Sequence, residues 1–284
     1  MGRCVGCPDW QPTHLPKVTN IMNRIDKKFK ELKKRRKKAF VAFIMAGDPS
    51  IAITRKLVFE LEKQGADIIE LGVAFSDPLA DGPTIQRASE RALKRKANLD
   101  SACNLVRNVR LKTQIPIAFL TYYNILYHYG LERFVEKAKS SGVDGVIVPD
   151  LPPEESGELR RIARKKGFSL IHLLAPTSSR QRIKMISNAS TGFIYYVSLT
   201  GTTGARKELP KDLSASLRLI KRSTNKPVCV GFGISRPGQV KAISRLADGV
   251  IVGSAIIKTI EKNIGKQKLV ENVGKFVRRL TCML

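Results

Sequence analysis

The chain has 284 residues, of which 43 % are hydrophobic and 26 % charged, an ordinary composition for a packed globular protein. These values exclude a disordered, collagen-like or fibrous chain, and no apolar run approaches the roughly 20 residues of a membrane-spanning helix. The 51 lysines and arginines against 24 acidic residues give a net charge of +27, which could attract nucleic acid or another polyanion non-specifically. The N-terminus lacks the apolar core of a secretory signal, so we expect a cytoplasmic protein.

The chain begins with an aperiodic segment, residues 1–20, which we predict to be a flexible extension before a single domain of residues 21–284. Within it, Cys4 and Cys7 form a CxxC motif near His14. A zinc site would need a fourth ligand and usually has a second cysteine pair, so we predict no metal site. The simpler interpretation is a reduced tail.

A first helix is predicted after the extension, because Ile21, Ile25, Phe29 and Leu32 recur at helical spacing. The basic run 33–38 closes this helix, and cations near a helix C-terminus suit the helix dipole. A nucleic-acid patch is the alternative interpretation of this run. A solvated helix face is the commoner case.

Eight short apolar segments then follow, separated by amphipathic helices. Continuous apolar runs of this length are typical of strands buried on both faces. The predicted strands are 40–46, 67–72, 116–122, 145–150, 169–175, 193–197, 227–232 and 249–253. The predicted helices are 51–64, 84–96, 99–112, 131–140, 154–166, 179–187, 213–221, 239–246, 254–261 and 266–280.

This alternation predicts an α/β fold, a (β/α)8 TIM barrel with an extra N-terminal helix and an extra helix after strand 2. An open doubly wound sheet is the alternative, but no GxGxxG motif follows the first strand. In a barrel of this kind the active site lies at the carboxyl ends of the strands. Residues just after each apolar run are therefore the candidates for function.

Two carboxylates follow from this rule. Glu70 is embedded in the apolar second strand, and alternation places its side chain opposite Ile69 and Leu71, towards the barrel interior. An apolar pocket would raise its pKa towards neutrality, which suits a general acid or base. A structural carboxylate in a buried salt bridge is the alternative. Asp81 lies in a turn beside Gly82 and would by itself be a turn or helix-cap residue.

Glycine-rich loops follow the last three predicted strands. The segment 198–206 is rich in glycine and hydroxyl residues and can close over a substrate, although it also resembles an ordinary flexible loop. The segments 231–235 and 253–255 occupy the positions where barrels commonly hold a phosphate against backbone N–H groups and a short helix N-terminus. We therefore predict a phosphorylated substrate.

Several motifs together resemble the tryptophan synthase α subunit family over about residues 22–280. The stretch with residues 70–88 is highly specific to that family. The matching segments are MAGDPS (45–50), ELGVAFSDPLADGPTIQRA (70–88), DGVIVPDLPPEES (144–156), SLTGTTGARKEL (198–209), GFGIS (231–235) and VGSA (252–255).

The resemblance implies a lyase of tryptophan biosynthesis that reversibly cleaves indole-3-glycerol phosphate into indole and glyceraldehyde 3-phosphate. It implies that Glu70 is the catalytic acid and base and that Asp81 is a second catalytic carboxylate stabilising positive charge on the indole nitrogen. By the same matching, Tyr195 contacts the reacting end of the substrate and Thr203 helps to position Asp81. No cofactor is implied in this chain, because indole itself serves as the electron sink.

The remaining implied roles concern substrate binding. The residues matching the indole slot are Phe43, Tyr122 and Ile147, for which plain barrel core is the alternative. The residues matching the phosphate site are Gly204, Gly233, Gly253 and Ser254. This chain departs from the usual family pattern at Ala74 (commonly proline), Thr202 (commonly valine) and Arg36 (commonly glycine), which affects the expected rate and loop closure more than the reaction type.

The resemblance also implies an α2β2 complex with a tryptophan synthase β subunit that carries pyridoxal phosphate. The segments 77–82 and 148–153 match the contact surface, with Asp77 and Pro152 as the expected interface residues. Three alternatives are a different phosphate-binding barrel such as a sugar-phosphate isomerase, a basic nucleic-acid-binding protein, and a slow subunit that mainly activates its partner.

Overall fold

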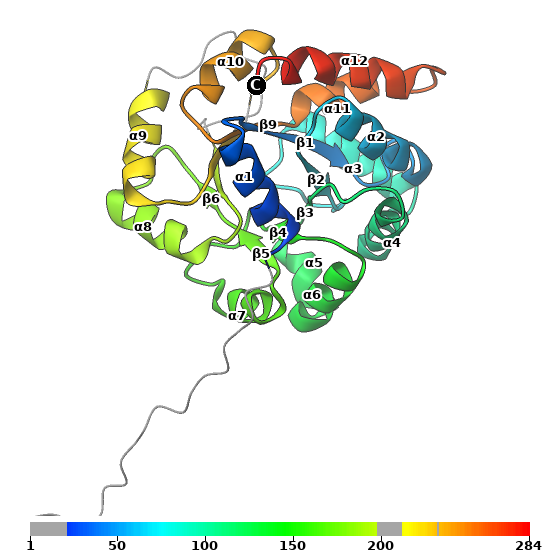
Figure 1. Cartoon of the computed structure of the whole chain (residues 1–284). Coiled ribbons are helices and arrows are strands. Elements are labelled where there is room, and N and C mark those ends of the chain that lie inside the picture. Colours follow the sequence, from blue (N-terminus) through cyan, green and yellow to red (C-terminus); the bar gives the residue numbers. More distant parts are fainter. Residues whose placement is uncertain (1–21, 198–211, 232) are drawn as a thin grey trace, which may run out of the picture.

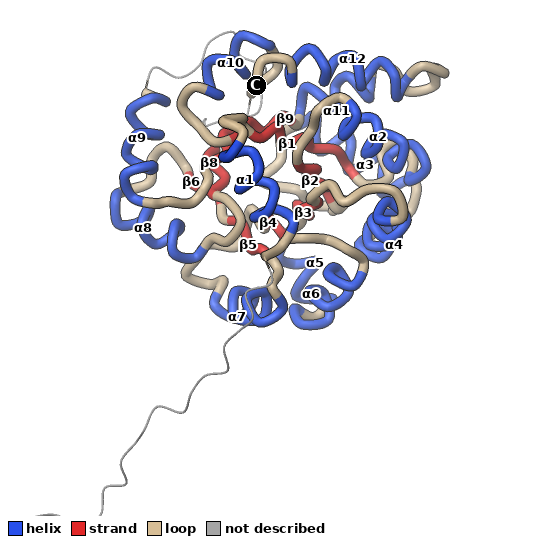
Figure 2. Tube along the Cα trace, viewed as in Figure 1, coloured by secondary structure: helices blue, strands red, loops and turns tan. Residues whose placement is uncertain are grey.

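The strands of this protein form a nearly closed parallel barrel (Figure 2). The computed structural model describes residues 22–197, 212–231 and 233–284, and within these residues nine strands pair in the order β5-β4-β3-β2-β1-β9-β8-β7-β6. The strands are β1 (Ala39–Met45), β2 (Ile68–Gly72), β3 (Ile117–Leu120), β4 (Gly145–Ile147), β5 (Ser169–Ile171), β6 (Leu173–Leu174), β7 (Ile194–Val197), β8 (Val228–Gly231) and β9 (Gly249–Val252).

The helices form a ring outside the strands, except for the first, which lies across one end of the barrel (Figure 1). They are α1 (Arg24–Lys34), α2 (Ile51–Lys63), α3 (Pro83–Lys94), α4 (Leu99–Arg110), α5 (Tyr123–Tyr129), α6 (Leu131–Ser140), α7 (Gly157–Lys166), α8 (Arg180–Ala189), α9 (Leu213–Ser223), α10 (Pro237–Ser244), α11 (Ser254–Glu261) and α12 (Leu269–Thr281). The predicted barrel is confirmed, with the extra helices α1 and α4. In the part of the chain that is described, no helix is both long and apolar enough to cross a bilayer.

The predicted fifth strand, 169–175, is divided into β5 and β6 at His172. The backbone N–H of His172 donates to the Ser190 hydroxyl (3.2 Å), while its carbonyl accepts from the N–H of Tyr195 (3.1 Å). β5 pairs with β4 and β6 pairs with β7. β5 and β6 are thus two consecutive parts of one chain segment, each paired with a different neighbouring strand, and the covalent chain joins them at this point of the barrel.

Helix α5 was not predicted from the sequence. The apolar run 116–122 continues into YYNILYHY, so the strand and the helix have no polar boundary between them. In the structure β3 ends at Leu120 and Tyr122 is the residue that caps α5. Gly130, at a φ of 88°, then separates α5 from α6 in the left-handed region that favours glycine.

Buried side chains fall into two clusters, as alternation requires. Outward-facing strand residues such as Phe40 and Ile44 pack against the helix ring. The inward-facing row includes Val41, Ile68, Ala118, Ile147, Ile171, Phe193, Tyr195, Cys229 and Ile251. Ile25, Phe29 and Leu32 of α1 belong to the same inner cluster, and we call these three side chains the α1 plug.

Polar contacts and apolar contacts both hold the α1 plug in place. The Asn23 side chain accepts from the N–H of Asp26 (3.1 Å) and caps the helix, while its amide donates to the Ser169 hydroxyl (2.6 Å). Arg24 forms an ion pair with the buried Asp144 (2.9 Å). On the apolar face, the Phe29 and Phe193 rings lie 5.7 Å apart. The amino ends of the strands are thus closed.

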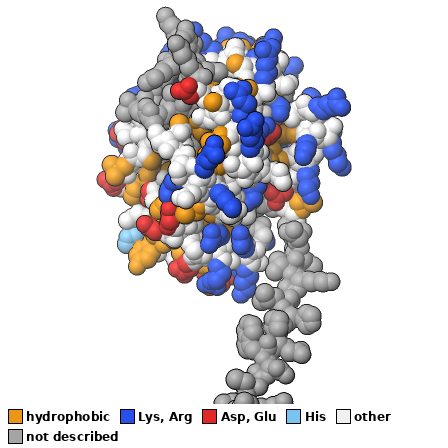
Figure 3. All heavy atoms as spheres, turned by 90° about the vertical axis from the view of Figure 1, so that its left-hand side faces the viewer, with side chains coloured by type: hydrophobic (Ala, Val, Ile, Leu, Met, Phe, Trp, Pro, Cys, Tyr) orange, Lys and Arg blue, Asp and Glu red, His pale blue; other side chains and the backbone are white. Residues whose placement is uncertain are grey.

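Part of the positive charge of the described residues lies on the outer helices. Figure 3 shows lysine and arginine side chains spread over the side that bears α8 and α9, with few acidic side chains between them. Arg180, Arg182 and Lys184 lie on α8, and Lys221 and Arg222 on α9. Some of this charge is paired, as in Lys221 with Asp248 (2.9 Å).

Candidate active site

Glu70 projects from β2 into the barrel, as its place in the alternating strand predicts. Its neighbours in the parallel register are Phe43 on β1 and Ala118 on β3. Glu70 is 1 % exposed, and no described residue forms a hydrogen bond with its Oε2. Burial, with a further contribution from the charge of Asp81, raises the pKa of the Glu70 carboxyl from 4.5 to about 8. Glu70 therefore holds a proton near neutral pH.

Asp81 lies in the loop between β2 and α3, and its geometry is fixed by Tyr122. The Tyr122 hydroxyl donates to Asp81 Oδ2 (3.0 Å) and accepts from the N–H of Ala80 (3.1 Å). Gln86 donates to the Asp81 carbonyl (2.9 Å). Burial raises the pKa of Asp81 to about 6, and the Tyr122 hydrogen bond acts in the opposite direction. Two carboxyls with separated pKa values, one neutral and one ionised at pH 7, are thus present together.

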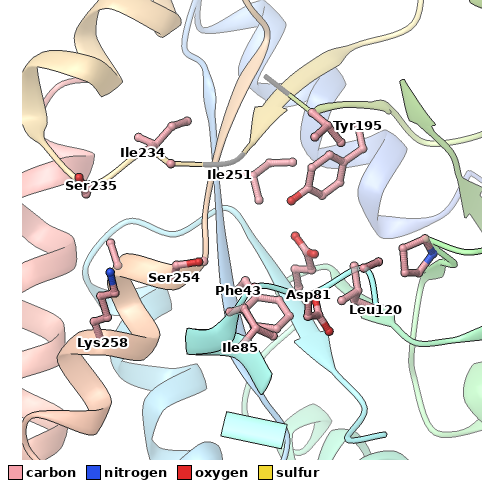
Figure 4. A pocket seen from close by; sticks show the side chains of 18 of the residues that line it. Phe43, Asp81, Ile85, Leu120, Tyr195, Ile234, Ser235, Ile251, Ser254 and Lys258 are labelled. Carbon is pink, nitrogen blue, oxygen red and sulfur yellow. The ribbon is translucent and has the colours of Figure 1, made fainter. Parts of the chain in front are cut away.

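Both carboxyls line a cavity of about 550 Å3 at the carboxyl ends of the strands (Figure 4). Its walls are mainly apolar, which explains why the two pKa values are raised. The larger aliphatic and aromatic side chains on the walls are Phe43, Leu79, Ile85, Leu120, Leu173, Tyr195, Val197, Ile234, Ile251 and Phe276. A cavity of this size and lining can hold a flat aromatic group beside two carboxyls.

Tyr195 enters this cavity from β7, and its ring lies against Gly231 of β8, two residues beyond its register partner Cys229. A Cβ on Gly231 would lie 2.7 Å from the Tyr195 ring, closer than van der Waals contact allows. Burial and the nearby charges of Glu70 and Asp81 raise the pKa of the Tyr195 hydroxyl well above 10. Tyr195 therefore presents a neutral hydroxyl next to the acid pair.

The other end of the cavity is formed by glycine turns and the start of α11. Gly233, at a φ of 77°, Gly253 and Ser254 line this end. The first N–H groups of an α-helix have no partner within the helix and carry the positive end of its dipole. An anionic group is stabilised at such a place. The cavity thus has acids at one end and, at the other, a helix start that suits an anion, which we call the anion-binding end.

An ion-pair network joins the two sides of the cavity. Arg91 on α3 contacts Asp48 through two bonds (2.7 and 2.9 Å) and also contacts Glu261 on α11 (2.9 Å). Arg87 contacts the same Glu261 (2.8 Å). The hydrogen bond from Arg87 is the largest of several effects that lower the pKa of Glu261 to about 2. The network fixes the helix after the Asp81 loop against the helix that begins the anion-binding end.

The residues predicted from sequence are not all on the cavity wall. Phe43, Tyr195, Gly233, Gly253 and Ser254 line it together with Glu70 and Asp81. Tyr122 is 4 % exposed and acts through its hydrogen bond to Asp81, while Ile147 is fully buried in the inner cluster with the α1 plug. Thr203 and Gly204 lie outside the described residues.

Several residues that line the cavity were not predicted from the sequence. Leu120, Leu173 and Ile251 face inwards near the ends of their strands, and alternation would have found them. Lys258 on α11 and Lys262, the C-cap residue that follows this helix, also line the cavity. They follow Ser254 at successive four-residue intervals, the spacing of one helix face, which was the available signal.

No group of three or more His, Cys, Asp or Glu side chains suited to a metal ion is found within residues 22–197, 212–231 and 233–284. The CxxC motif of Cys4 and Cys7 and the nearby His14 lie outside the described residues.

Known proteins resemble this chain over most of its length. The family model described as "Tryptophan synthase alpha chain" matches residues 29–282. The tryptophan synthase alpha chain of Geotalea daltonii is 51 % identical over 246 residues, which are 87 % of this chain and 93 % of that protein. That of Caldanaerobacter subterraneus subsp. tengcongensis is 49 % identical over 259 residues, 91 % of this chain and 98 % of that protein.

Solved structures agree with this result. Tryptophan synthase subunit alpha from Legionella pneumophila superposes with a TM-score of 0.86 at 38 % identity, covering 92 % of this chain and 98 % of that one. A chain from the tryptophan synthase α2β2 complex of Pyrococcus furiosus gives a TM-score of 0.80 at 41 % identity, covering 85 % and 97 %. Sequence, fold and cavity therefore lead to one conclusion: this chain belongs to the tryptophan synthase alpha chain family.

Proposed function

We propose that Glu70 and Asp81 carry out the reaction of this lyase family in this chain, the reversible cleavage of indole-3-glycerol phosphate into indole and glyceraldehyde 3-phosphate in tryptophan biosynthesis. One observation supports the proposal most directly. A fully buried carboxyl, with a pKa raised to about 8, faces the same cavity as a second carboxyl that is ionised at pH 7. Such a pair can supply a proton and stabilise a positive charge at the same time.

In the first step, protonated Glu70 gives its proton to C3 of the indole ring. The ring then carries a positive charge that is shared with the indole nitrogen. Ionised Asp81, held by Tyr122, accepts a hydrogen bond from the indole N–H and stabilises this charge as it develops. The ring is now an electron sink for the bond to the side chain.

In the second step, the Glu70 carboxylate takes the proton from the side-chain hydroxyl next to the breaking bond. The oxygen forms a carbonyl, the carbon–carbon bond breaks, and its electron pair returns to the ring, which neutralises the nitrogen. The products are indole and an aldehyde, and Glu70 is protonated again. One carboxyl therefore serves as acid and then as base, and the proton count is balanced.

The apolar wall fits the indole ring, with Phe43 and Tyr195 as its positioning residues. Gly233, Gly253 and Ser254 at the opposite end are proposed to hold the phosphate, which the start of α11 favours. Thr203 and Gly204 keep the roles implied by the family resemblance, positioning Asp81 and binding phosphate. Tyr122 is proposed to orient Asp81, and Ile147 to support the slot from below.

The test is a steady-state assay of wild type and Glu70→Gln on indole-3-glycerol phosphate, with indole detected. We expect a loss of roughly 10³-fold or more in kcat, because the amide cannot transfer the proton, while substrate binding persists. Glu132→Gln, an exposed carboxyl on α6, is the matched control and should leave turnover unchanged. Near-normal turnover by Glu70→Gln would refute the assignment, and a sugar-phosphate isomerase activity in its place would favour the alternative barrel enzyme.

The partner is proposed to be a tryptophan synthase β subunit in an α2β2 complex, with pyridoxal phosphate on that subunit and none in this chain. The loop 77–82 is the proposed contact, together with 148–153. Leu79 in this loop is 92 % exposed, the largest value among the big hydrophobic side chains of the described residues, and it also lines the cavity. An apolar side chain so exposed at the cavity mouth suits a partner that receives indole. We also propose that the protein is cytoplasmic. Its basic outer helices are proposed to bind polyanions weakly and in a salt-sensitive manner.

A further inference from the structure

Lys258 lies at the anion-binding end of the cavity but is not part of the glycine turns. It is the fifth residue of α11, one turn after Ser254, and is half-buried on the cavity wall. Figure 4 shows its ammonium group on the side of the helix that faces Ser254 and Ser235. Helix side chains lean towards the helix N-terminus, so a lysine at this position reaches back over the first turn.

The charge of Lys258 is not matched by the described protein. None of the ion pairs found among residues 22–197, 212–231 and 233–284 involves it. Glu261, the acidic residue of the same helix, forms its ion pairs with Arg87 and Arg91. An anion bound at this end of the cavity can therefore pair with the ammonium group of Lys258.

We propose that Lys258 recognises the charge of the substrate phosphate and makes the enzyme selective for a phosphomonoester dianion over an uncharged hydroxyl. The inference rests on the proposed function and adds a specificity-determining residue to it. Backbone N–H groups bind any well-placed acceptor, charged or not. The attraction of an ammonium group, in contrast, grows with the negative charge of the ligand. Lys262, one turn further along and exposed, lies on the same face and extends the positive field towards solvent.

The test uses the reverse reaction, in which indole condenses either with glyceraldehyde 3-phosphate or with glyceraldehyde. Lys258→Gln should raise KM for the phosphorylated aldehyde about tenfold or more, with kcat changed less than threefold. Turnover of the unphosphorylated aldehyde should be unchanged, and Lys258→Arg should restore much of the selectivity. Lys241→Gln, an exposed lysine on α10, removes the same net charge and should have no effect on either substrate.

Binding of inorganic phosphate, measured by calorimetry, separates this proposal from the proposed function. Lys258→Gln should weaken phosphate binding about tenfold and reduce its dependence on salt, even if the chain turned out to act on another phosphate ester. Lys258→Met keeps most of the aliphatic stem and removes only the charge. It should weaken phosphate binding as much as Lys258→Gln does, which would exclude lost packing as the cause. Equal phosphate affinity in wild type and both variants, or an equal rise in KM for both aldehydes, would overturn the proposal.

Discussion

The two ends of the barrel interior are built from the same strands, but one is packed with apolar side chains and the other borders the cavity. At the amino ends, the α1 plug packs with inward-facing apolar residues. At the carboxyl ends, the same inward row holds Glu70 and borders a cavity of about 550 Å3. Alternation decides that a residue faces inwards, whereas its depth along the strand decides whether it stabilises the fold or contacts the substrate. Substitutions at the two ends should therefore separate stability from catalysis.

The largest effect is expected at the closed end. Phe29→Ala removes a ring that is 7 % exposed and packs on Phe193, and it should lower the free energy of unfolding by about 3–5 kcal/mol. The folded fraction should keep its kcat. Urea denaturation measures the change, with Lys30→Ala on the exposed face of α1 as the control. A loss below about 1 kcal/mol would mean that the plug is not part of the core.

At the open end, Asp81→Asn should cost at least about 10²-fold in kcat/KM, or roughly 2.7 kcal/mol, because the amide cannot balance the charge on the indole nitrogen. Its stability should change little or rise, since a buried charge is removed. Steady-state kinetics and a thermal melt together give both numbers. Asp100→Asn on α4 is a matched control outside the cavity, and equal activity of the two variants would remove Asp81 from the mechanism.

Tyr122→Phe is a smaller change that tests how Asp81 is tuned. The Tyr122 hydroxyl stabilises ionised Asp81, so its removal should raise the Asp81 pKa further above about 6. The acid limb of the kcat/KM profile should move to higher pH, with a loss of roughly fivefold below pH 7 and less above it. A uniform loss at every pH would show a structural effect instead. Tyr127→Phe, exposed on α5, should leave the profile unchanged.

The smallest effect concerns the end of α1. Arg36 has a φ of 56°, in the left-handed region that favours glycine, and glycine is the residue commonly found there in the family. Arg36→Gly should raise the free energy of unfolding by about 0.5–1 kcal/mol without changing activity. Lys37→Gly removes the same charge without that backbone conformation and should destabilise. Equal shifts in the two variants would contradict this account.

Much of this architecture could be predicted from the sequence because its signals are local. Eight apolar runs, the extra helices and the inward face of Glu70 follow from spacing alone. Helix α5 was missed because an apolar strand passes into an apolar helix, and only the turn at Gly130 marks its end. The break at His172 was missed because it depends on a hydrogen bond to Ser190, which is distant in sequence.

The candidate site was predicted less completely, for a related reason. Spacing indicates which way Ile147 points, but not that its side chain is fully covered and absent from the cavity wall. The four-residue spacing after Ser254 indicates the helix face of Lys258, but only the closed barrel shows that this face borders the cavity beside Ser235. The partnership of Tyr122 with Asp81 likewise joins two loops that share no sequence signal.

The central claim is that Glu70 is a neutral acid when the enzyme meets its substrate. Infrared difference spectra of wild type minus Glu70→Gln, recorded across pH, measure the protonation of this one carboxyl. The account predicts a protonated carboxyl band at pH 7 that disappears with a midpoint near 8. A Glu70 that is already ionised at pH 7, with a midpoint near the ordinary value for a glutamate, would contradict it.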